Sequence, residues 1–530
     1  MLKVLITDPL NELGLEVLQK GGIEVDYSPG LAKSDILSRI ADYDGLLVRS
    51  GTQVDPDLID ACSSRMKVIG RAGVGVDNIN LDHATKKGII VVNSPDGNTT
   101  AAAEHTIAMM MSLARQIPEA DASIKSGEWR RNKFLGVELN DKVLGLIGLG
   151  KIGSKVAQVA LALGMEVIGY DPLISAERAL QMGIKLVELD QVWARSDFIS
   201  LHVPKIPQTV NLINSETIAK LKNGARIINC ARGGLIHEGD LAQAIQSGKV
   251  AGAAIDVFEQ EPVNPDNPLL KLGNKVIATP HLGASTEEAQ INVAVDTAKQ
   301  IVQVLQEGFA RGAVNLPGLR QVNLEEMRSV LELTSKLGSL LSQISEIGRP
   351  SQINLRVFGA IAQKETSALL LVALQSFLSQ RVEGVTLVNA PLIAKEKGIV
   401  AIETKLSQTS DAAGQIALEV ETDHGQFQVA GSINNEQNIP MLTSLNHYGF
   451  LVPISQTMLL TFHSDRPGVI AKISLLLGNA NINISGMALG RKEIRHEAVM
   501  LCALDEIPKA DLIHGIQGLP EIQRALLLKL

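Results

Sequence analysis

A glycine motif bounded by two apolar runs is the feature that most constrains the fold of this chain. Gly148, Gly150 and Gly153 lie in KVLGLIGLGKIGSKVAQVALALG, where a strand-like run enters a Gly-rich turn and a helix-like run leaves it. In this setting the first two glycines allow a tight turn and close approach to a pyrophosphate, and the third allows close helix–strand packing. The start of the helix offers free N–H groups to phosphates. The motif therefore predicts a parallel α/β domain that binds a dinucleotide.

Asp171 ends the next apolar run, MEVIGYD, near the spacing of about 20 residues that separates such a motif from an acidic residue. A carboxylate at this position accepts hydrogen bonds from the ribose hydroxyls and repels a 2′-phosphate. NAD is therefore expected rather than NADP. The competing interpretation is a Gly-rich structural turn without a ligand.

Strand-like and helix-like runs alternate on both sides of the motif. Strands are expected at 2–7, 23–27, 45–48, 67–69, 89–92, 142–147, 165–171, 198–202, 225–229, 250–255 and 275–278. Such alternation predicts two doubly wound parallel sheets, each covered by helices on both faces. Long helices are expected from Thr99 to about Gln116 and from Ser285 to Gly308. We expect the second helix to return the chain to the first domain, which makes that domain discontinuous.

The character of the chain changes after Pro317. Residues 320–452 contain many Ser, Gln and Leu and read as an α+β spacer or regulatory domain, while the last ~75 residues follow the order βαββαβ of a ferredoxin-like domain. The predicted division is a substrate-binding domain at 1–97 and 285–316, a dinucleotide-binding domain at 98–284, an intervening domain at 317–452 and a C-terminal domain at 453–530. A chain of 530 residues is too long for one hydrophobic core, so several domains are expected.

Charge and cysteine content narrow the class of protein. A net charge of −8 argues against a nucleic-acid partner, which requires a basic patch. Cys62, Cys230 and Cys502 are far apart, so neither a disulfide framework nor a metal site is expected, and a reducing compartment is favoured. With no apolar run of the ~18–20 residues that a membrane span needs, and an N-terminus that begins as a strand, we expect a cytoplasmic protein without a membrane partner.

Three charged residues follow successive predicted strands of the dinucleotide domain. Arg232, Glu261 and His281 lie in IINCARGGLI, AAIDVFEQEPV and VIATPHLGAST. Parallel sheets bind ligands at the carboxyl ends of their strands. An Arg can bind a carboxylate, a His can accept a proton near neutral pH, and a Glu can stabilise the imidazolium. Each residue alone has an ordinary surface interpretation, but the set predicts a 2-hydroxy acid dehydrogenase.

Three further residues remain open to two interpretations. His202 lies near the nicotinamide ribose or is a packed structural His. Asp256 faces the nicotinamide carboxamide or stabilises a turn. His105, within AAAEHTIAMM, is expected in packing or at an interface.

The motifs GLGKIG, YDP, CARGG, DVFEQEP and HLGAST occur here in the order found in the D-2-hydroxyacid dehydrogenase family. The chain resembles this family over essentially its whole length, and in particular its long form with an intervening domain and a C-terminal ACT domain. The resemblance implies a Rossmann NAD-binding domain and a flavodoxin-like substrate domain. It implies substrate binding by Arg232, and an acid/base pair made of Glu261 and His281. The implied NAD contacts are Gly148, Gly150, Lys151, Ile152, Gly153, Asp171, His202, Val203, Pro204, Cys230, Ala231, Arg232, Asp256, His281, Gly283 and Ala284.

The long form further implies the oxidation of 3-phospho-D-glycerate to 3-phosphohydroxypyruvate, the first step of L-serine synthesis. The dianionic phosphate of this small anionic substrate requires cations beyond Arg232. The expected substrate residues are Arg49, Ser50, Arg71, Gly73, Val74, Gly75, Asn93, Arg131, Lys133, Arg232 and His281. The resemblance implies that Arg131 reaches the cleft from a partner subunit of a homo-oligomer, dimer or tetramer. An ordinary solvated charge run is the alternative for Arg130, Arg131 and Lys133.

The C-terminal segment FHSDRPGVIAKI…NINI carries the ACT resemblance. It implies an L-serine effector site at His463, Asp465 and Asn483, with a dimerisation module that binds no ligand as the alternative. Two other functions stay open for the whole chain. One is the oxidation of another small D-2-hydroxy acid, such as glycerate or 2-hydroxyglutarate. The other is a non-catalytic regulator that senses NAD.

Overall fold

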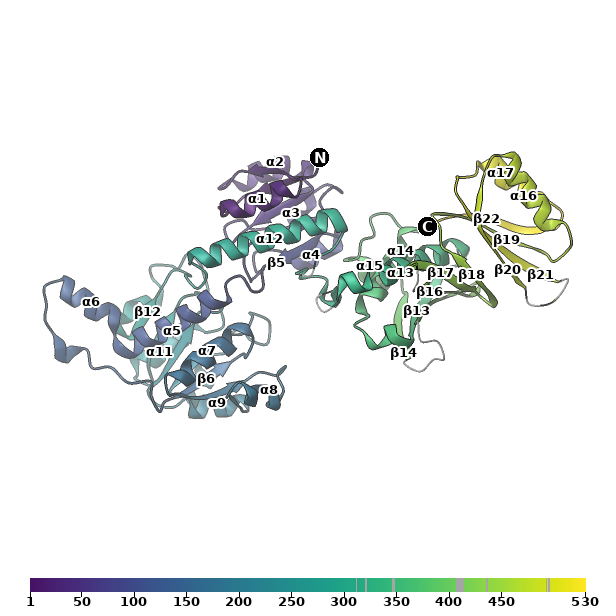
Figure 1. Ribbon diagram of the computed structural model, residues 1–530. Coiled ribbons are helices and arrows are strands. Elements are labelled where there is room, and N and C mark those ends of the chain that lie inside the picture. The colour runs from purple at the N-terminus through teal and green to yellow at the C-terminus, as the bar shows by residue number, and fades with distance from the viewer. Residues whose placement is uncertain are drawn as a thin grey trace.

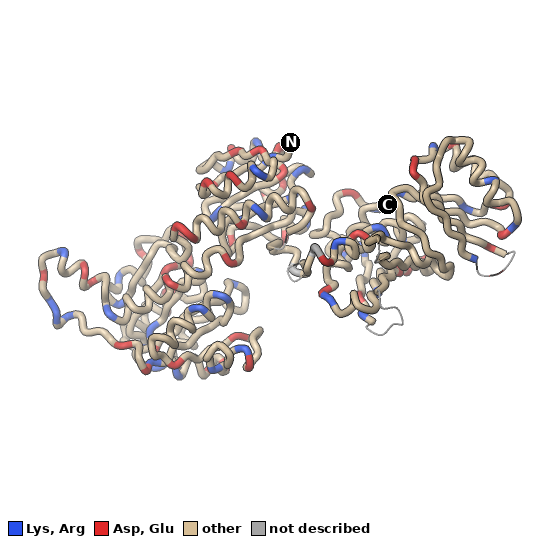
Figure 2. Tube along the Cα trace, viewed as in Figure 1, with Lys and Arg blue, Asp and Glu red and all other residues tan. Residues whose placement is uncertain are grey.

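Four β-sheets and their helices form an elongated molecule in the computed structural model of the chain (Figure 1). The structure describes residues 1–310, 312–319, 322–345, 348–406, 414–434, 437–491, 493 and 496–530. None of the helices in these ranges is long and apolar enough to cross a membrane. Basic and acidic residues are interspersed along the chain (Figure 2).

The first sheet is parallel, with strand order β2-β1-β3-β4-β5. This order is flavodoxin-like. Its strands are β1 (Lys3–Ile6), β2 (Glu24–Tyr27), β3 (Gly45–Val48), β4 (Val68–Arg71) and β5 (Ile90–Asn93). Its helices are α1 (Glu12–Lys20), α2 (Lys33–Arg39), α3 (Pro56–Ala61) and α4 (Leu81–Lys86). Helix α12 (Glu287–Glu307) packs against α1 and β4, so the later helix does return to this sheet.

The second sheet has seven parallel strands in the order β12-β11-β10-β9-β6-β7-β8, the Rossmann arrangement with one added strand. Its strands are β6 (Val143–Ile147), β7 (Glu166–Tyr170), β8 (Lys185–Leu186), β9 (Phe198–Leu201), β10 (Ala225–Asn229), β11 (Val250–Ile255) and β12 (Val276–Ala278). Its helices are α5 (Thr99–Arg115), α6 (Ile117–Lys125), α7 (Lys151–Ala162), α8 (Ala176–Gln181), α9 (Leu189–Arg195), α10 (Ser215–Lys220) and α11 (Glu238–Gln246). Both doubly wound sheets confirm the predicted fold class.

The third sheet is mixed, with order β14-β13-β15-β16-β17-β18. It contains β13 (Pro350–Phe358), β14 (Val400–Leu406), β15 (Gln415–Thr422), β16 (Gly425–Asn434), β17 (Ile439–Leu445) and β18 (Tyr448–Pro453), with helices α13 (Leu324–Ile344), α14 (Ser367–Ser379) and α15 (Ala390–Glu396). The fourth sheet is antiparallel, with order β20-β21-β19-β22. Its elements are β19 (Thr457–Ser464), α16 (Val469–Asn479), β20 (Ile484–Arg491), β21 (Glu497–Leu504), α17 (Ala510–Gln517) and β22 (Ile522–Lys529), which confirms the βαββαβ order.

The hydrophobic cores divide the molecule differently from the sheets. One continuous cluster of buried side chains runs from Val4 in the first sheet through Leu333 and Leu418 to Leu528 in the last strand. The first and fourth sheets each have a further cluster on their opposite face, around Leu46 and around Leu459. The second sheet has two clusters of its own, one around Trp193 and one around Phe198. We call the second sheet with its helices the dinucleotide lobe and the first sheet with α12 the substrate lobe.

Candidate functional site

In the glycine turn between β6 and α7, the fold has no room for a side chain at two of the three glycines, but it has room for one at the third. Gly148 has a φ of +93°, and a Cβ there would lie 2.4 Å from the carbonyl oxygen of His202. A Cβ at Gly153 would lie 2.2 Å from the carbonyl oxygen of Gly148. A Cβ at Gly150 would have none of the described atoms within 4 Å. The fold therefore requires glycine at 148 and 153, whereas Gly150 keeps the start of α7 open to a phosphate.

Asp171 lies beside this turn, directly after β7. Its carboxylate accepts hydrogen bonds from the backbone N–H of Leu149 at 2.7 Å and of Leu173 at 2.9 Å. These bonds fix the carboxylate but leave it further acceptor positions, since an ionised carboxylate offers about four. The arrangement fits a ribose with free hydroxyls.

A cleft of about 310 Å³ separates the two lobes at the carboxyl ends of their strands. Its lining is Arg71, Val74, Gly75, Asp77, Asn98, Ala102, Ile152, His202, Val203, Pro204, Cys230, Ala231, Arg232, His281, Gly283 and Ala284. The sequence had singled out all of these except Asp77, Asn98 and Ala102. Asn98 comes directly before α5, in the NSPDGNT segment, and its buried Oδ1 has no hydrogen-bond partner among the described residues.

His281 and Glu261 form a pair at this cleft. His281 Nδ1 lies 2.7 Å from Glu261 Oε2, and Glu261 Oε1 accepts the Phe258 N–H at 3.0 Å. Burial alone would raise the pKa of Glu261, but hydrogen bonds from His281 and Phe258 hold that pKa below its usual value. The carboxylate is thus ionised where it can orient the imidazole and stabilise its protonated form. A second cavity of about 570 Å³ reaches the same pair from the side of Ser50.

Asp256 holds the loop that carries His281. The Asp256 side chain is fully buried and accepts hydrogen bonds from the Thr279 hydroxyl at 2.6 Å, the Leu282 N–H at 2.7 Å and the Gly283 N–H at 2.9 Å. Burial would raise the pKa of Asp256, but these bonds and His105 keep it below its usual value. Its described contacts thus favour the turn-stabilising interpretation. His105, expected in packing or at an interface, contacts Asp256 within the dinucleotide lobe.

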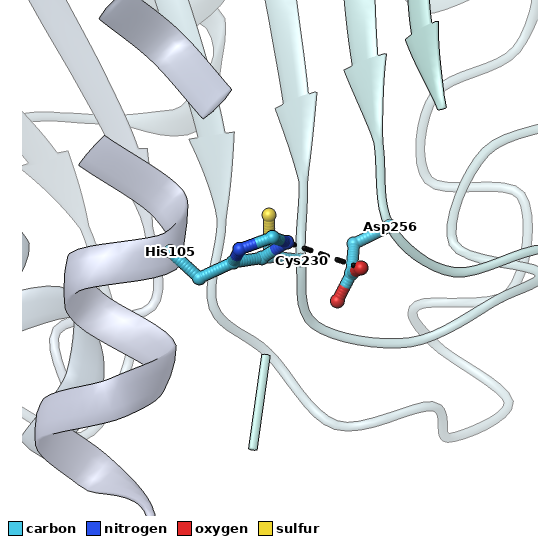
Figure 3. A group of neighbouring side chains, drawn as sticks. All are labelled: His105, Cys230 and Asp256. Atoms are coloured by element: carbon cyan, nitrogen blue, oxygen red, sulfur yellow. Dashed lines mark ion pairs between the residues drawn. The ribbon is translucent and has the colours of Figure 1, made fainter. Parts of the chain in front are cut away.

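His105, Cys230 and Asp256 are the one group among the described residues with metal-binding side chains gathered together, their ligand atoms all within 4.8 Å (Figure 3). The Asp256 oxygens already accept three hydrogen bonds from the 279–283 loop. Burial raises the pKa of the Cys230 thiol to about 12. The described contacts of this group form a hydrogen-bond network centred on the Asp256 carboxylate.

Arginine side chains from both lobes converge on the cleft. Arg232 Nε binds Asp77 at 2.9 Å, and a Cβ at Gly75 would lie 2.0 Å from Arg232 Nη2, so glycine there makes room for the guanidinium. Arg71 approaches Gly73 in the same way, and its buried Nε has no partner among the described residues. Burial, followed by repulsion from Arg232 and Arg49, lowers the pKa of Arg71 to about 10. An anion between these groups would relieve that repulsion.

The remaining expected substrate residues occupy three kinds of position. Asn93 is buried and donates to the carbonyl of Val74, so it positions the 73–75 loop. Ser50 is exposed beside the second cavity. Arg131 and Lys133 form a short 3-10 helix after α6, on an extension that projects from the dinucleotide lobe (Figure 1). Arg131 lines a separate pocket with Trp129 and Phe134, so one chain does not bring it to the cleft.

Two expected cofactor residues have partners within the protein. Lys151, the first residue of α7, forms an ion pair with Asp96 across the lobes. Burial lowers the pKa of His202 to about 4, so this imidazole is neutral at pH 7, and its Nε2 lies 2.9 Å from the Ser200 hydroxyl. A neutral His at the cleft wall is compatible with both earlier interpretations of His202.

The expected effector residues lie at opposite ends of the fourth sheet. His463 is buried on β19 and Asp465 pairs with Arg491 at 3.4 Å. His463 on β19 and Arg491 on β20 both pair with Ala498 of β21, so they lie at the same end of the sheet. Asn483 instead binds Asp505 at 2.6 Å, near the start of β20. The eight-residue strand β20, from Ile484 beside Asn483 to Arg491, spans roughly 25 Å, so one chain does not bring the three together.

Comparisons with known proteins agree with this geometry. Residues 107–283 match the family model "D-isomer specific 2-hydroxyacid dehydrogenase, NAD binding domain". A D-lactate dehydrogenase from Aquifex aeolicus, solved with NAD and lactic acid, is 31% identical with a TM-score of 0.52, covering 57% of this chain and 96% of that one. A glyoxylate reductase from Paecilomyes thermophila is 30% identical with a TM-score of 0.55, covering 59% and 98%. The protein is an NAD-dependent oxidoreductase of the 2-hydroxyacid dehydrogenase class.

Full-length relatives define the family within that class. Residues 326–444 match the "D-3-phosphoglycerate dehydrogenase intervening domain". The D-3-phosphoglycerate dehydrogenase of Synechocystis sp. is 46% identical over 100% of this chain and 95% of its own length. Those of Methanocaldococcus jannaschii and Bacillus subtilis are 43% and 41% identical, covering 99% and 98% of both chains. The chain belongs to the D-3-phosphoglycerate dehydrogenase family.

Proposed function

We propose that this enzyme oxidises 3-phospho-D-glycerate to 3-phosphohydroxypyruvate with NAD, the first step of L-serine synthesis. The observation that carries the proposal is the His281–Glu261 pair, at 2.7 Å, whose His281 lines the same cleft as Arg232 and as Ile152 of the glycine motif. The full-length match to relatives named for this activity favours phosphoglycerate over other small hydroxy acids and over a non-catalytic regulator.

Arg232 and His281 act on the reacting end of the substrate. The Arg232 guanidinium binds the carboxylate and places C2 in the cleft. His281 Nε2 takes the proton of the C2 hydroxyl while the C2–H bond breaks, and a C=O bond forms. Glu261 stabilises the imidazolium that results. NAD, when bound, supplies the hydride acceptor.

Arg49 and Arg71 bind the phosphate end of the substrate. Both belong to the substrate lobe, opposite the dinucleotide, and Arg49 lines a cavity of about 660 Å³ beside the start of α12. Arg131, with Lys133, completes the site from a partner subunit. Exposed Trp129 and Leu135 beside them support this, because large apolar side chains on an extension are typical of a contact surface.

The substrate assignment is tested by comparing kcat/KM for 3-phosphoglycerate and glycerate. A hydrogen bond to a charged group is worth about 1.5–3 kcal/mol, so Arg49→Ala and Arg131→Ala should each reduce the preference for the phosphorylated substrate by roughly 10–150-fold. Arg195→Ala, which removes a surface pair with Glu166, is the matched control. An unchanged preference in both variants would refute the phosphate assignment.

The same proposal covers regulation and assembly. The enzyme is a cytoplasmic homo-oligomer with the four domains at 1–97 with 285–316, 98–284, 317–452 and 453–530. Three free cysteines support a reducing compartment. An L-serine site made of His463, Asp465 and Asn483 requires two copies of the fourth sheet, since one copy separates them. A rate of NADH formation that stays flat through millimolar L-serine would count against this site.

A further inference from the structure

His105 links the first helix of the dinucleotide lobe to the loop that carries His281. It lies on α5, with its side chain 19% exposed, and its Nε2 is 3.1 Å from Asp256 Oδ1 and 3.3 Å from Thr279 Oγ1 (Figure 3). Helix α5 starts at Thr99, directly after the segment that crosses between the lobes. The reaction described above does not involve this histidine.

The loop after β12 depends on Asp256 for its conformation. In addition to the three bonds to its carboxylate, the backbone carbonyl of Asp256 accepts the His281 N–H at 2.9 Å. His281 has a φ of +56°, in the left-handed region. A non-glycine residue keeps that conformation only where its surroundings hold it. The direction of the catalytic imidazole is therefore set by its bonds to Asp256 and by Glu261.

The Asp256 carboxylate needs its contact with α5. It is fully buried, and a buried charge is costly unless donors surround it. Its other donors all come from the 279–283 loop itself, so they move with that loop. The Asp256 backbone is held at the end of β11, where its N–H donates to the Asn229 carbonyl at 3.0 Å, so the part that His105 can orient is the side chain. The His105 imidazole is the contact that ties this carboxylate to α5, and without it the carboxylate can rotate and the loop bonded to it can shift.

We propose that His105 is a positioning residue, which through Asp256 holds the 279–283 loop so that His281 meets the C2 hydroxyl. This inference rests on the proposed function, because His105 acts through His281. A displacement of the reacting groups by about 1 Å can reduce turnover by roughly 100-fold. The substrate anchors do not contact His105, so binding should change little.

A matched pair of substitutions tests the contact. In His105→Gln the side-chain amide can reach the place of Nε2, whereas in His105→Asn it is one methylene shorter. We expect Gln to retain kcat within about threefold, and Asn to lose roughly 10–100-fold in kcat with KM for 3-phosphoglycerate within about threefold. Equal kcat for the two variants, or a loss confined to KM, would overturn the proposal. Circular dichroism and NADH binding establish that both variants are folded.

A double-mutant cycle separates this proposal from the assignment of His281. If His105 acts through His281, adding His105→Asn to His281→Ala should cause no further loss of turnover, because residues that act as a unit are strongly non-additive. Losses that multiply would place the effect of His105 elsewhere and overturn the positioning role. If His281→Ala alone retained full turnover, the proposed function itself would fail, whatever the His105 variants do.

Discussion

Replacing Glu261 with Gln removes the negative charge beside His281 with little change in side-chain volume. In the native site the carboxylate accepts from both His281 Nδ1 and the Phe258 N–H. A Gln side chain has one acceptor oxygen, so one of these donors loses its partner. The variant should stabilise a protonated His281 less than the wild type does.

The geometry sets the size of this effect. Two unit charges about 4 Å apart interact by ~1 kcal/mol in water and ~4 kcal/mol at an effective dielectric constant of ~20. The side chains of His281 and Glu261 are 48% and 37% exposed, so the value lies toward the lower limit, at ~1–2 kcal/mol. Since about 1.36 kcal/mol corresponds to a factor of ten in rate, kcat/KM for oxidation should fall by roughly tenfold, because the imidazolium formed in the reaction is less stable.

The assay is NADH formation from 3-phosphoglycerate between pH 5 and pH 9 for wild type and Glu261→Gln. An unchanged kcat/KM at the plateau of the pH profile would refute the electrostatic reasoning. Thermal unfolding supplies a control. Because the folded-state pKa of Glu261 is lowered from 4.5, its contribution to stability is present above that pH and is lost as the pH falls through the folded value. The melting temperatures of the two proteins should therefore converge in acid.

Three other predictions follow from the cofactor site and the core. Asp171→Ser should raise kcat/KM for NADP relative to NAD by about tenfold or more, measured as reduced cofactor formed, because like charges at the ribose cost several kcal/mol; an unchanged ratio would contradict the role of Asp171. Gly150→Ala should keep the native melting temperature but weaken NADH binding. Gly153→Ala should lose about 1–3 kcal/mol of stability, because its Cβ would overlap the Gly148 carbonyl. Equal melting temperatures for the two variants would argue against this distinction. Leu528→Ala, at a 1% exposed position, should cost about 2–5 kcal/mol in denaturant unfolding, and a smaller loss would indicate that the site collapses around the cavity.

The sequence predicts the two doubly wound sheets well because most of their strands are short apolar runs bounded by turn residues, whereas the two-residue edge strand β8 (Lys185–Leu186) has no such run and was not expected. The runs at 45–48, 225–229 and 250–255 coincide with β3, β10 and β11. In the third sheet, strands such as β14 expose several side chains and carry no such run. Its six strands therefore could not be resolved beyond an α+β class.

Some residues of the candidate site could be predicted from local sequence pattern and others could not. Residues in Gly-marked loops at strand ends were identified, because chain direction alone gathers them at one edge of a parallel sheet. Asp77 was missed because its contact with Arg232 joins positions 155 residues apart in the chain. The bond from His105 to Asp256 was missed for the same reason, since helical periodicity marks His105 only as a packed residue. Pairing between distant segments depends on how the lobes meet, and local sequence pattern contains no signal for it.

The continuous cluster from Val4 to Leu528 affects how the molecule unfolds. Packed cores open as cooperative units, so the faces of the substrate lobe and of the two C-terminal sheets that share this cluster should exchange their amide hydrogens together, while the opposite faces of the first and fourth sheets have clusters of their own. The dinucleotide lobe, with separate clusters, should open on its own. A shortened chain that ends near residue 452 would leave apolar surface of the third sheet uncovered and prone to aggregation. In the energetics of unfolding, one face of the substrate lobe is therefore coupled to the C-terminal sheets, whereas the described clusters of the dinucleotide lobe are separate from that core.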